Sequence, residues 1–228
     1  MKLPYRVSML LGLLICAGAG AANPPPERAI RVAFVVSNGL NVMDFAGPWE
    51  VFQDVMLPVA GAAEDHRMPF ELYTVAASTA AVTTTGGARV IPSYSFRTAP
   101  RPDIVVIGAQ ADNSPAMLAW LRTQYAGNAT LASVCTGARK LALSGLLDGK
   151  TATTHHDYVA DFRDAFPRVQ WLETRRFVHG GERLYTAGGL TSGIDLALHL
   201  VAVRFGAPVA QATADYMEYA GEGWRQPD

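Results

Sequence analysis

The sequence has few cysteines, no excess of basic residues and no nucleotide-binding glycine motif. Only Cys16 and Cys135 are cysteines among 228 residues, which excludes a framework of several disulfides. The formal net charge is −1, which argues against nucleic acid as a partner. No Walker or G-x-G-x-x-G pattern occurs, so we expect no nucleotide cofactor. Half of the residues are hydrophobic, which is enough to form the core of a globular domain.

Residues 1–21 have the features of a secretory signal peptide. A short basic region precedes an apolar stretch at residues 9–17, and the small residues 19–21 form an A-x-A cleavage site. The apolar stretch is shorter than the ~20 residues that span a bilayer, so we predict cleavage after Ala21 and not a membrane anchor. The alternative is a lipoprotein cleaved before Cys16, against which the bulky Ile15 argues.

Export changes both the charge and the thiol content of the mature chain. Cleavage removes Lys2 and Arg6 and no acidic residue, so the formal net charge moves from −1 to −3. Cys16 is lost with the signal peptide, and Cys135 then remains without a disulfide partner. We therefore expect a periplasmic or secreted protein that makes no membrane contact after cleavage.

The remaining sequence predicts a proline-rich linker at 22–29 and one α/β domain at 30–228. Apolar runs predict strands, and helical periodicity predicts helices between them. This alternation is typical of a mostly parallel sheet with helices on both faces. No repeat or second domain is evident, and we expect no DNA-binding module before Asp228. The expected strands are 30–36, 70–76, 104–107, 130–134 and 184–186; the expected helices are 49–55, 116–125, 191–204 and 208–219; the expected hairpin is 83–92.

Cys135 follows the predicted strand 130–134 directly and precedes a predicted helix that opens with Thr136. A residue in such a turn is presented to the cleft at the carboxyl end of the sheet, as in a nucleophile elbow. The amides of the first helical turn favour a thiolate there, so the position predicts a lowered thiol pKa. The alternative is a structural cysteine packed in the core.

Asp44 is the second candidate, since it lies between apolar Met43 and Phe45 near the end of the first strand. A carboxylate in such surroundings is costly to bury unless it has a partner. Next to a thiol it would act as a general acid or base, with a pKa raised by burial. The alternative is a cap for a helix that Pro48 begins.

Four weaker candidates lie in two other segments, each at a probable strand end. His155 and His156 come after Thr153 and Thr154, where a histidine could pair with the thiol. We predict no metal site, because no third ligand has a suggestive spacing. Gly108 and Ala109 follow the strand 104–107, and their amides could form an anion-binding pocket beside the thiol.

Three stretches resemble the isonitrile hydratase branch of the ThiJ/PfpI superfamily. They are VMDFAGPWEVF, SVCTGARKLALSGLLDGKTATTHH and YTAGGLTSGIDLALHLVAVRFG, the last continuing as APVAQATADYMEY. The resemblance implies a flavodoxin-like sandwich that forms a homodimer. It also implies a cysteine at the elbow, matched by Cys135, an acidic partner, matched by Asp44, and a threonine, matched by Thr136. The branch commonly has the motif T-T-H-W at the position of residues 153–156, so His156 replaces the tryptophan of that motif.

The resemblance implies a small-molecule substrate and the hydration of an isonitrile to an N-substituted formamide. Other cysteine chemistry, such as hydrolysis or glyoxalase-type reactions, is the alternative within the superfamily. A periplasmic small-molecule-binding or redox-sensing protein without turnover is the alternative outside enzymes. Similar domains also occur in transcription regulators with a helix-turn-helix module, which this sequence lacks.

Export is tested by sequencing the N-terminus of the mature protein. We expect the mature chain to begin at Ala22, because the small-residue site ends at Ala21. An intact Met1 in a cytoplasmic fraction, with no exported protein, contradicts this prediction.

Overall fold

The computed structural model describes residues 28–59 and 62–225. The predicted signal peptide and most of the predicted linker lie outside the described residues. None of the helices within these ranges is both long enough and apolar enough to span a membrane.

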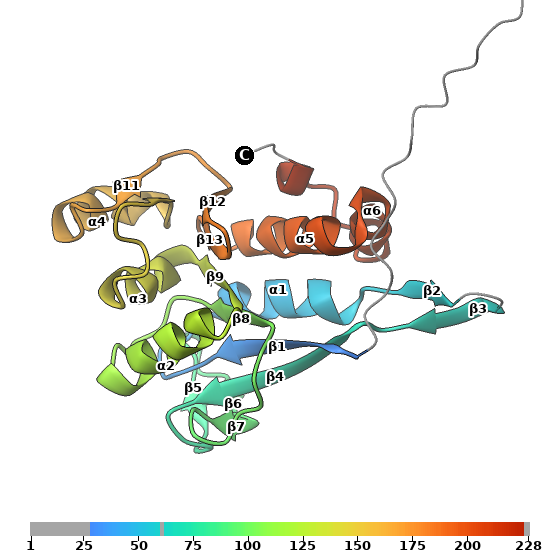
Figure 1. The fold of residues 1–228 in the computed structure, drawn as a ribbon, viewed down its shortest axis with the longest axis horizontal. Helices are drawn as coiled ribbons and strands as arrows, with labels where there is room; N and C mark the ends of the chain where they lie inside the picture. Colours follow the sequence, from blue (N-terminus) through green and yellow to red (C-terminus); the bar gives the residue numbers. More distant parts are fainter. Residues whose placement is uncertain (1–27, 60–61, 226–228) are drawn as a thin grey trace, which may run out of the picture.

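A seven-stranded sheet forms the centre of the molecule (Figure 1). Its spatial order is β12-β13-β9-β8-β1-β4-β7, and every neighbouring pair is parallel except β12 with β13. The five strands expected from the sequence are all present, which confirms the α/β class and the flavodoxin-like order of its parallel core. The strands are β1 (Ile30–Val35), β4 (Phe70–Ala76), β7 (Tyr94–Ser95), β8 (Ile104–Ile107), β9 (Thr130–Val134), β12 (Phe177–Gly181) and β13 (Leu184–Ala187).

Helices cover both faces of this sheet, and the alternation of side chains along β1 shows why. Val32 and Phe34 point into one apolar core, while Ala33 and Val35 point into the other. The first core is closed by α1 (Val42–Gln53), α5 (Ser192–Phe205) and α6 (Ala207–Tyr216). The second is closed by α2 (Pro115–Ala126), α3 (Ala138–Leu143) and α4 (Val159–Ala165).

Short elements surround this framework. The antiparallel pair β2 (Leu57–Val59) and β3 (Ala62–Arg67) extends from the body of the molecule (Figure 1). The predicted hairpin is confirmed as β5 (Val82–Thr83) with β6 (Arg89–Val90). A parallel pair, β10 (Thr151–Ala152) and β11 (Gln170–Trp171), and three 3₁₀ helices complete the chain. The 3₁₀ helices are η1 (Cys135–Gly137), η2 (His156–Tyr158) and η3 (Gly223–Arg225).

Two predicted helix bounds are wrong. The first helix begins at Val42 and not at Pro48, because the Asn41 side chain caps it by accepting from the Met43 amide at 3.0 Å. Pro48 therefore lies inside the helix, where it removes one backbone hydrogen bond. This earlier start places Asp44 in the first helical turn. The last helix ends at Tyr216, three residues earlier than expected.

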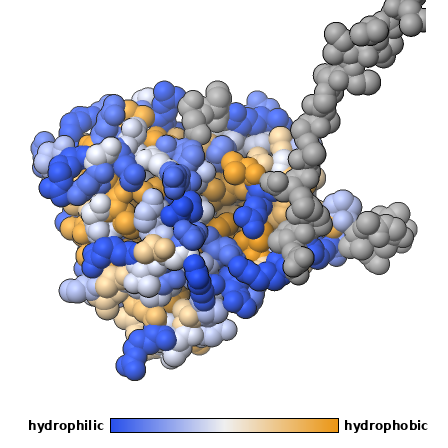
Figure 2. All heavy atoms as spheres, viewed as in Figure 1, coloured by the Kyte–Doolittle hydropathy of each residue, from blue (hydrophilic) through white to orange (hydrophobic). Residues whose placement is uncertain are grey.

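The surface around α1 and α5 is partly apolar. Figure 2 shows apolar residues among charged ones over these two helices. Val42 and Met43, at the start of α1, and Leu190, just before α5, are each about two-fifths exposed. They form an apolar rim close to the carboxyl end of the sheet.

Candidate active site

The carboxyl ends of β1, β8 and β9 meet where the strand order reverses around β1. In open α/β sheets, ligands bind at such a reversal, outside the carboxyl ends of the strands. The sequence that follows these three strands contains Asp44, Gly108 and Ala109, and Cys135, respectively. The fold therefore brings four residues of the predicted site to one place.

Cys135 directly follows β9 as the first residue of η1 and has a left-handed backbone, with φ of 57°. Such a conformation is costly for a residue with a side chain and persists only where the surroundings enforce it. Its amide donates to the Gly188 carbonyl at 2.8 Å, and its carbonyl accepts from the Thr154 hydroxyl at 3.0 Å. Gly137 follows so closely over the Ile107 carbonyl that any Cβ there would collide with the oxygen. The sharp strand-to-helix turn that the sequence predicted is present.

Asp44 is fully buried beside this turn. One carboxylate oxygen, Oδ2, accepts from the Ala109 amide at 2.9 Å, whereas Oδ1 makes no conventional hydrogen bond. The Cys135 thiol and the Leu190 amide are the other groups that stabilise the carboxylate charge. A Cβ added at Gly108 would lie 2.6 Å from the Asp44 Cβ, so only glycine fits there.

The surroundings raise the pKa of Asp44 to about 6. Burial is the largest cause, because the charged carboxylate loses its hydration. Hydrogen bonds from the Ala109 amide, the Cys135 thiol and the Leu190 amide offset part of this rise. At neutral pH the carboxylate is ionised, yet it gains a proton under mildly acidic conditions.

The predicted lowering of the Cys135 pKa is wrong, because the structure raises that pKa to about 11. Burial and the negative charge of Asp44 are the two largest causes, and they outweigh the amides of Thr136 and Leu190 at the sulfur. The helix behind the turn, α3, is only six residues long. At neutral pH the pair consists of a protonated thiol and an ionised carboxylate.

The amides at the sulfur are those of Thr136 and Leu190, and not those of Gly108 and Ala109. Ala109 uses its amide on Asp44, so the predicted anion-binding pair beside the thiol is not formed. Sequence reasoning missed Leu190, whose φ of 52° is also left-handed. Gly188 and Gly189, which precede Leu190, were the available signal. Glycines favour a tight turn, and such a turn can bring a backbone amide close to neighbouring side chains.

His155 directly follows Thr154, whose hydroxyl donates to the Cys135 carbonyl. Its ring packs against Gly189, and its Nδ1 accepts from the Asp157 amide at 3.3 Å. Among the hydrogen bonds of residues 28–59 and 62–225, none joins His155 to Cys135. The His156 ring stacks on His155 with centroids 4.4 Å apart.

The two histidines and Asp157 could together hold a metal ion, since their ligand atoms lie within 4.8 Å of one another. The spacing in the sequence suggested no third ligand, but Asp157, the residue after His156, offers one in the structure. His156 and Asp157 are exposed and His155 is partly buried.

Lys140 is a buried cation that sequence reasoning also missed. Its side chain is almost fully buried, and Nζ donates to the Gln110 carbonyl at 2.6 Å. Burial lowers the Lys140 pKa to about 8, with Arg139 lowering it further and Asp112 and Cys135 opposing this. Because Gln110 directly follows Ala109, Lys140 supports the turn whose amide holds Asp44. A lysine within the apolar run that forms α3 was the signal.

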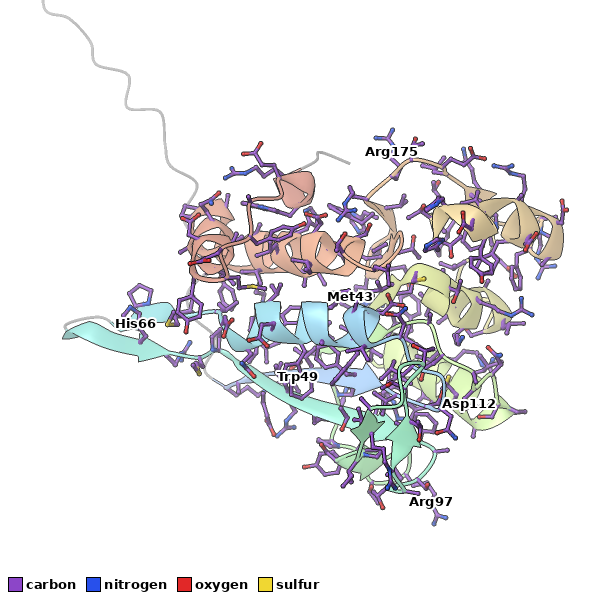
Figure 3. The ribbon with its side chains drawn as sticks, turned by 180° about the vertical axis from the view of Figure 1, so that it is seen from behind. Met43, Trp49, His66, Arg97, Asp112 and Arg175 are labelled. Carbon is purple, nitrogen blue, oxygen red and sulfur yellow. The ribbon has the colours of Figure 1, made fainter. Side chains whose placement is uncertain are left out.

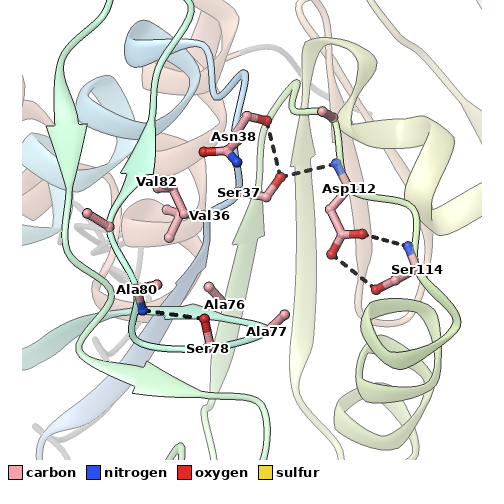
Figure 4. A pocket seen from close by; sticks show the side chains of 12 residues that line it. Val36, Ser37, Asn38, Ala76, Ala77, Ser78, Ala80, Val82, Asp112 and Ser114 are labelled. Carbon is pink, nitrogen blue, oxygen red and sulfur yellow. Dashed lines mark hydrogen bonds between the residues drawn. The ribbon is translucent and has the colours of Figure 1, made fainter.

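Two pockets open at this end of the sheet. One, of about 420 Å³, lies beside the Cys135 turn and shares with it Thr154, Gly188 and Leu190. The other, of about 480 Å³, lies at the ends of β1 and β4 (Figure 4). Its carboxylate, Asp112, accepts from the amide and hydroxyl of Ser114, and no cysteine, histidine or lysine lines it. The chemistry-bearing residues therefore adjoin the first pocket.

Comparisons with known proteins identify a family and several relatives of this chain. The model of the DJ-1/PfpI family matches residues 30–203. Isonitrile hydratase of Pseudomonas putida is 31% identical over 197 residues, which cover 84% of this chain and 79% of that protein. The HTH-type transcriptional regulator GbdR of Pseudomonas aeruginosa is 29% identical over 176 residues, which cover 72% of this chain. The chain spans about half of that regulator's length, 47%.

Solved structures give the same result. A ThiJ/PfpI family protein from Pseudomonas syringae has a TM-score of 0.73 and 26% identity, covering 88% of this chain and 79% of its own. DJ-1beta of Drosophila melanogaster has a TM-score of 0.69 at 18% identity, covering 85% of this chain and all of its own, and shows the similarity of fold alone.

The raised pKa of Asp44 predicts how stability depends on pH. The folded state holds the proton more tightly than the unfolded state, so ionisation of Asp44 destabilises the fold as pH rises from 3.8 through about 6. Asp44→Asn cannot ionise. We therefore expect the difference in unfolding free energy between this variant and the wild type to be larger at about pH 7 than at about pH 4, by up to about 3 kcal/mol in favour of the variant. Urea unfolding at the two pH values measures this gain. The exposed Asp164→Asn is the control, and an equal difference at both pH values contradicts the prediction.

The raised pKa of Cys135 predicts slow alkylation. At about pH 8 we expect iodoacetamide to modify Cys135 more slowly in the folded protein than in the denatured chain, because little thiolate is present. Asp44→Asn removes the adjacent negative charge and should speed the reaction several-fold. Mass spectrometry of the peptide that contains Cys135 gives the rates. Rapid modification of the wild type at mildly acidic pH contradicts a raised thiol pKa.

Proposed function

The chain belongs to the DJ-1/PfpI family, and we propose that it is a cysteine-dependent enzyme that hydrates an isonitrile to an N-substituted formamide. The observation that carries the proposal is the buried pair of Cys135 and Asp44. The pair offers a nucleophile and a proton carrier side by side, and this reaction needs both. The similarity to isonitrile hydratase supports the choice of substrate.

In the first step the Cys135 sulfur attacks the isonitrile carbon. Because the thiol is protonated at rest, the Asp44 carboxylate takes its proton as the carbon–sulfur bond forms. The Asp44 carboxyl then gives this proton to the same carbon. The product is a thioimidate, in which carbon carries one hydrogen, a single bond to sulfur and a double bond to nitrogen.

In the second step water adds to the thioimidate carbon. Asp44, ionised again, takes a proton from the water, and that proton goes on to the nitrogen. The tetrahedral intermediate then loses its hydroxyl proton and expels the sulfur as a thiolate, which is reprotonated. The overall change adds one water to one isonitrile. The amides of Thr136 and Leu190, which contact the sulfur, stabilise the charge on it as it leaves.

This mechanism requires no cofactor, since each proton moves between Cys135, Asp44, water and substrate. The apolar rim of Met43 and Leu190 suits the organic substituent of an isonitrile. We further propose that the protein is exported to the periplasm or secreted, and that it forms a homodimer without a nucleic-acid partner. Amide or ester hydrolysis and glyoxalase-type chemistry are the other reactions that the same pair could perform.

A second candidate function is small-molecule binding or redox sensing without turnover. The observation that favours it is the similarity to a protein named as a transcriptional regulator. Ligand binding that survives Cys135→Ala, together with no turnover of any isonitrile, would support this second function over the first.

The enzymatic proposal is tested by turnover of an isonitrile panel, with the formamide product detected directly. We expect Cys135→Ala to abolish turnover and Cys135→Ser to do nearly the same, because an alcohol is a weaker nucleophile than a thiol. Asp44→Asn should reduce turnover by about 10²-fold or more, since it keeps the shape and loses proton transfer.

Circular dichroism of the variants shows whether the fold is intact. Near-normal turnover in both Cys135→Ala and Asp44→Asn would show that the site lies elsewhere.

A further inference from the structure

The pocket beside the Cys135 turn is rich in cationic and hydroxyl side chains and has no acidic one. We call it the arginine pocket. It contains two arginines, two histidines, four threonines and one serine among its lining residues, with glycine, valine and leucine as the rest. A pocket of about 420 Å³ is large enough for a small organic ligand. Its lining favours a ligand that carries negative charge.

Two backbone hydrogen bonds connect this pocket to the reactive cysteine. The Cys135 amide donates to the Gly188 carbonyl at 2.8 Å, and the Gly188 amide donates to the Arg176 carbonyl at 2.9 Å. Leu190, whose amide contacts the thiol, also lines the pocket. The arginine pocket therefore borders the backbone turn that presents the sulfur.

Arg176 has a structural role. Its guanidinium forms an ion pair with Asp195, which is almost fully buried, and its Nε donates to Asp195 Oδ2 at 2.6 Å. The Tyr219 hydroxyl donates to the other oxygen of the same carboxylate at 3.0 Å. The charge of Arg176 is thus already compensated by a buried carboxylate that lies in the first turn of α5.

Arg175 is different, since it forms no ion pair or side-chain hydrogen bond among the described residues. It is exposed on the loop between β11 and β12, at the outer edge of the molecule (Figure 3). The carboxylate of Glu173, two residues before Arg175, accepts from Arg163 at 2.9 Å and is already paired. Arg175 therefore supplies an uncompensated positive charge at the rim of the pocket.

We propose that the arginine pocket binds a carboxylate at the far end of the substrate, with Arg175 as the side chain that recognises it. The substrate class is then an isonitrile that carries a carboxylate, where the isonitrile part rests on the proposed function. A guanidinium pairs with a carboxylate through two parallel hydrogen bonds. The Thr191 hydroxyl, which accepts from Arg176 at 3.2 Å, keeps its own proton to donate to a remaining lone pair. Arg175 binds and orients the substrate and takes no part in bond making.

Calorimetry with a formamide product tests this binding without any turnover. N-formylglycine carries the carboxylate, and its methyl ester is the neutral match. We expect the wild type to bind the acid about fivefold or more tightly than the ester at low salt, with the preference shrinking as salt screens the exposed guanidinium. A chelator in the buffer excludes binding through a metal at His155, His156 and Asp157.

The variants attribute the preference to one side chain. Arg175→Ala should bring the acid-to-ester ratio close to one, and Arg175→Lys should keep part of it, because lysine retains the charge without the paired donors. Arg97→Ala, at an exposed arginine beyond β7 and distant from the pocket, is the matched control and should keep the full ratio (Figure 3). Equal binding of acid and ester by the wild type, or an unchanged ratio in Arg175→Ala, overturns the proposal. Binding of inorganic phosphate with no binding of the acid overturns the choice of a carboxylate.

The outcome is separable from that of the proposed function. Binding of N-formylglycine through Arg175, with no isonitrile turnover, supports the pocket and contradicts the reaction. Turnover of neutral isonitriles with no preference for an isonitrile that bears a carboxylate supports the reaction and contradicts the pocket.

Discussion

The left-handed backbone at Cys135 is the constraint on which the site depends. It turns the chain sharply between β9 and η1 and directs the thiol toward Asp44, which α1 holds in its first turn. Close packing enforces the turn, since Gly137 must lie against the Ile107 carbonyl and Gly108 against Asp44. A side chain at either glycine would displace the strand ends that form the site, so the sheet and the nucleophile are fixed together.

Burial of several ionisable groups in this small volume determines the chemistry. Loss of hydration raises the pKa values of Asp44 and Cys135 and lowers that of Lys140, so each group is shifted toward its neutral form. The negative charge of Asp44 raises the pKa of the Cys135 thiol further. At rest the pair therefore carries one negative charge, which lies on the Asp44 carboxylate, while the thiol keeps its proton. Attack by sulfur and loss of the thiol proton are consequently a single linked event in the mechanism we propose.

The sequence predicted the sheet well because strands buried on both faces have long apolar runs with clear ends. The family resemblance implied that Asp44 is the acidic partner of Cys135, and the structure brings the two together because both follow parallel strands that end at the same edge. The sequence did not predict the sign of the thiol shift. That sign depends on how deeply the sulfur is buried and on the distance to one carboxylate, which a strand-and-helix pattern does not contain. The start of α1 was missed because proline favours the first helical turn, whereas here the helix begins earlier, at the Asn41 cap, and Pro48 lies inside it. Leu190 and Lys140 act through a backbone amide and through burial, so the glycines before Leu190 and the lysine within an apolar run were the signals available for them.

The position of the shared proton is the central claim, and infrared difference spectroscopy measures it directly. Spectra of the wild type minus Cys135→Ala isolate the S–H stretch, and spectra of the wild type minus Asp44→Asn isolate the carboxyl stretch. With pKa values of about 6 for Asp44 and about 11 for Cys135, the wild type at neutral pH should show the S–H band together with an ionised carboxylate. A missing S–H band together with a protonated carboxyl band at the same pH would place the proton on Asp44 and contradict the account.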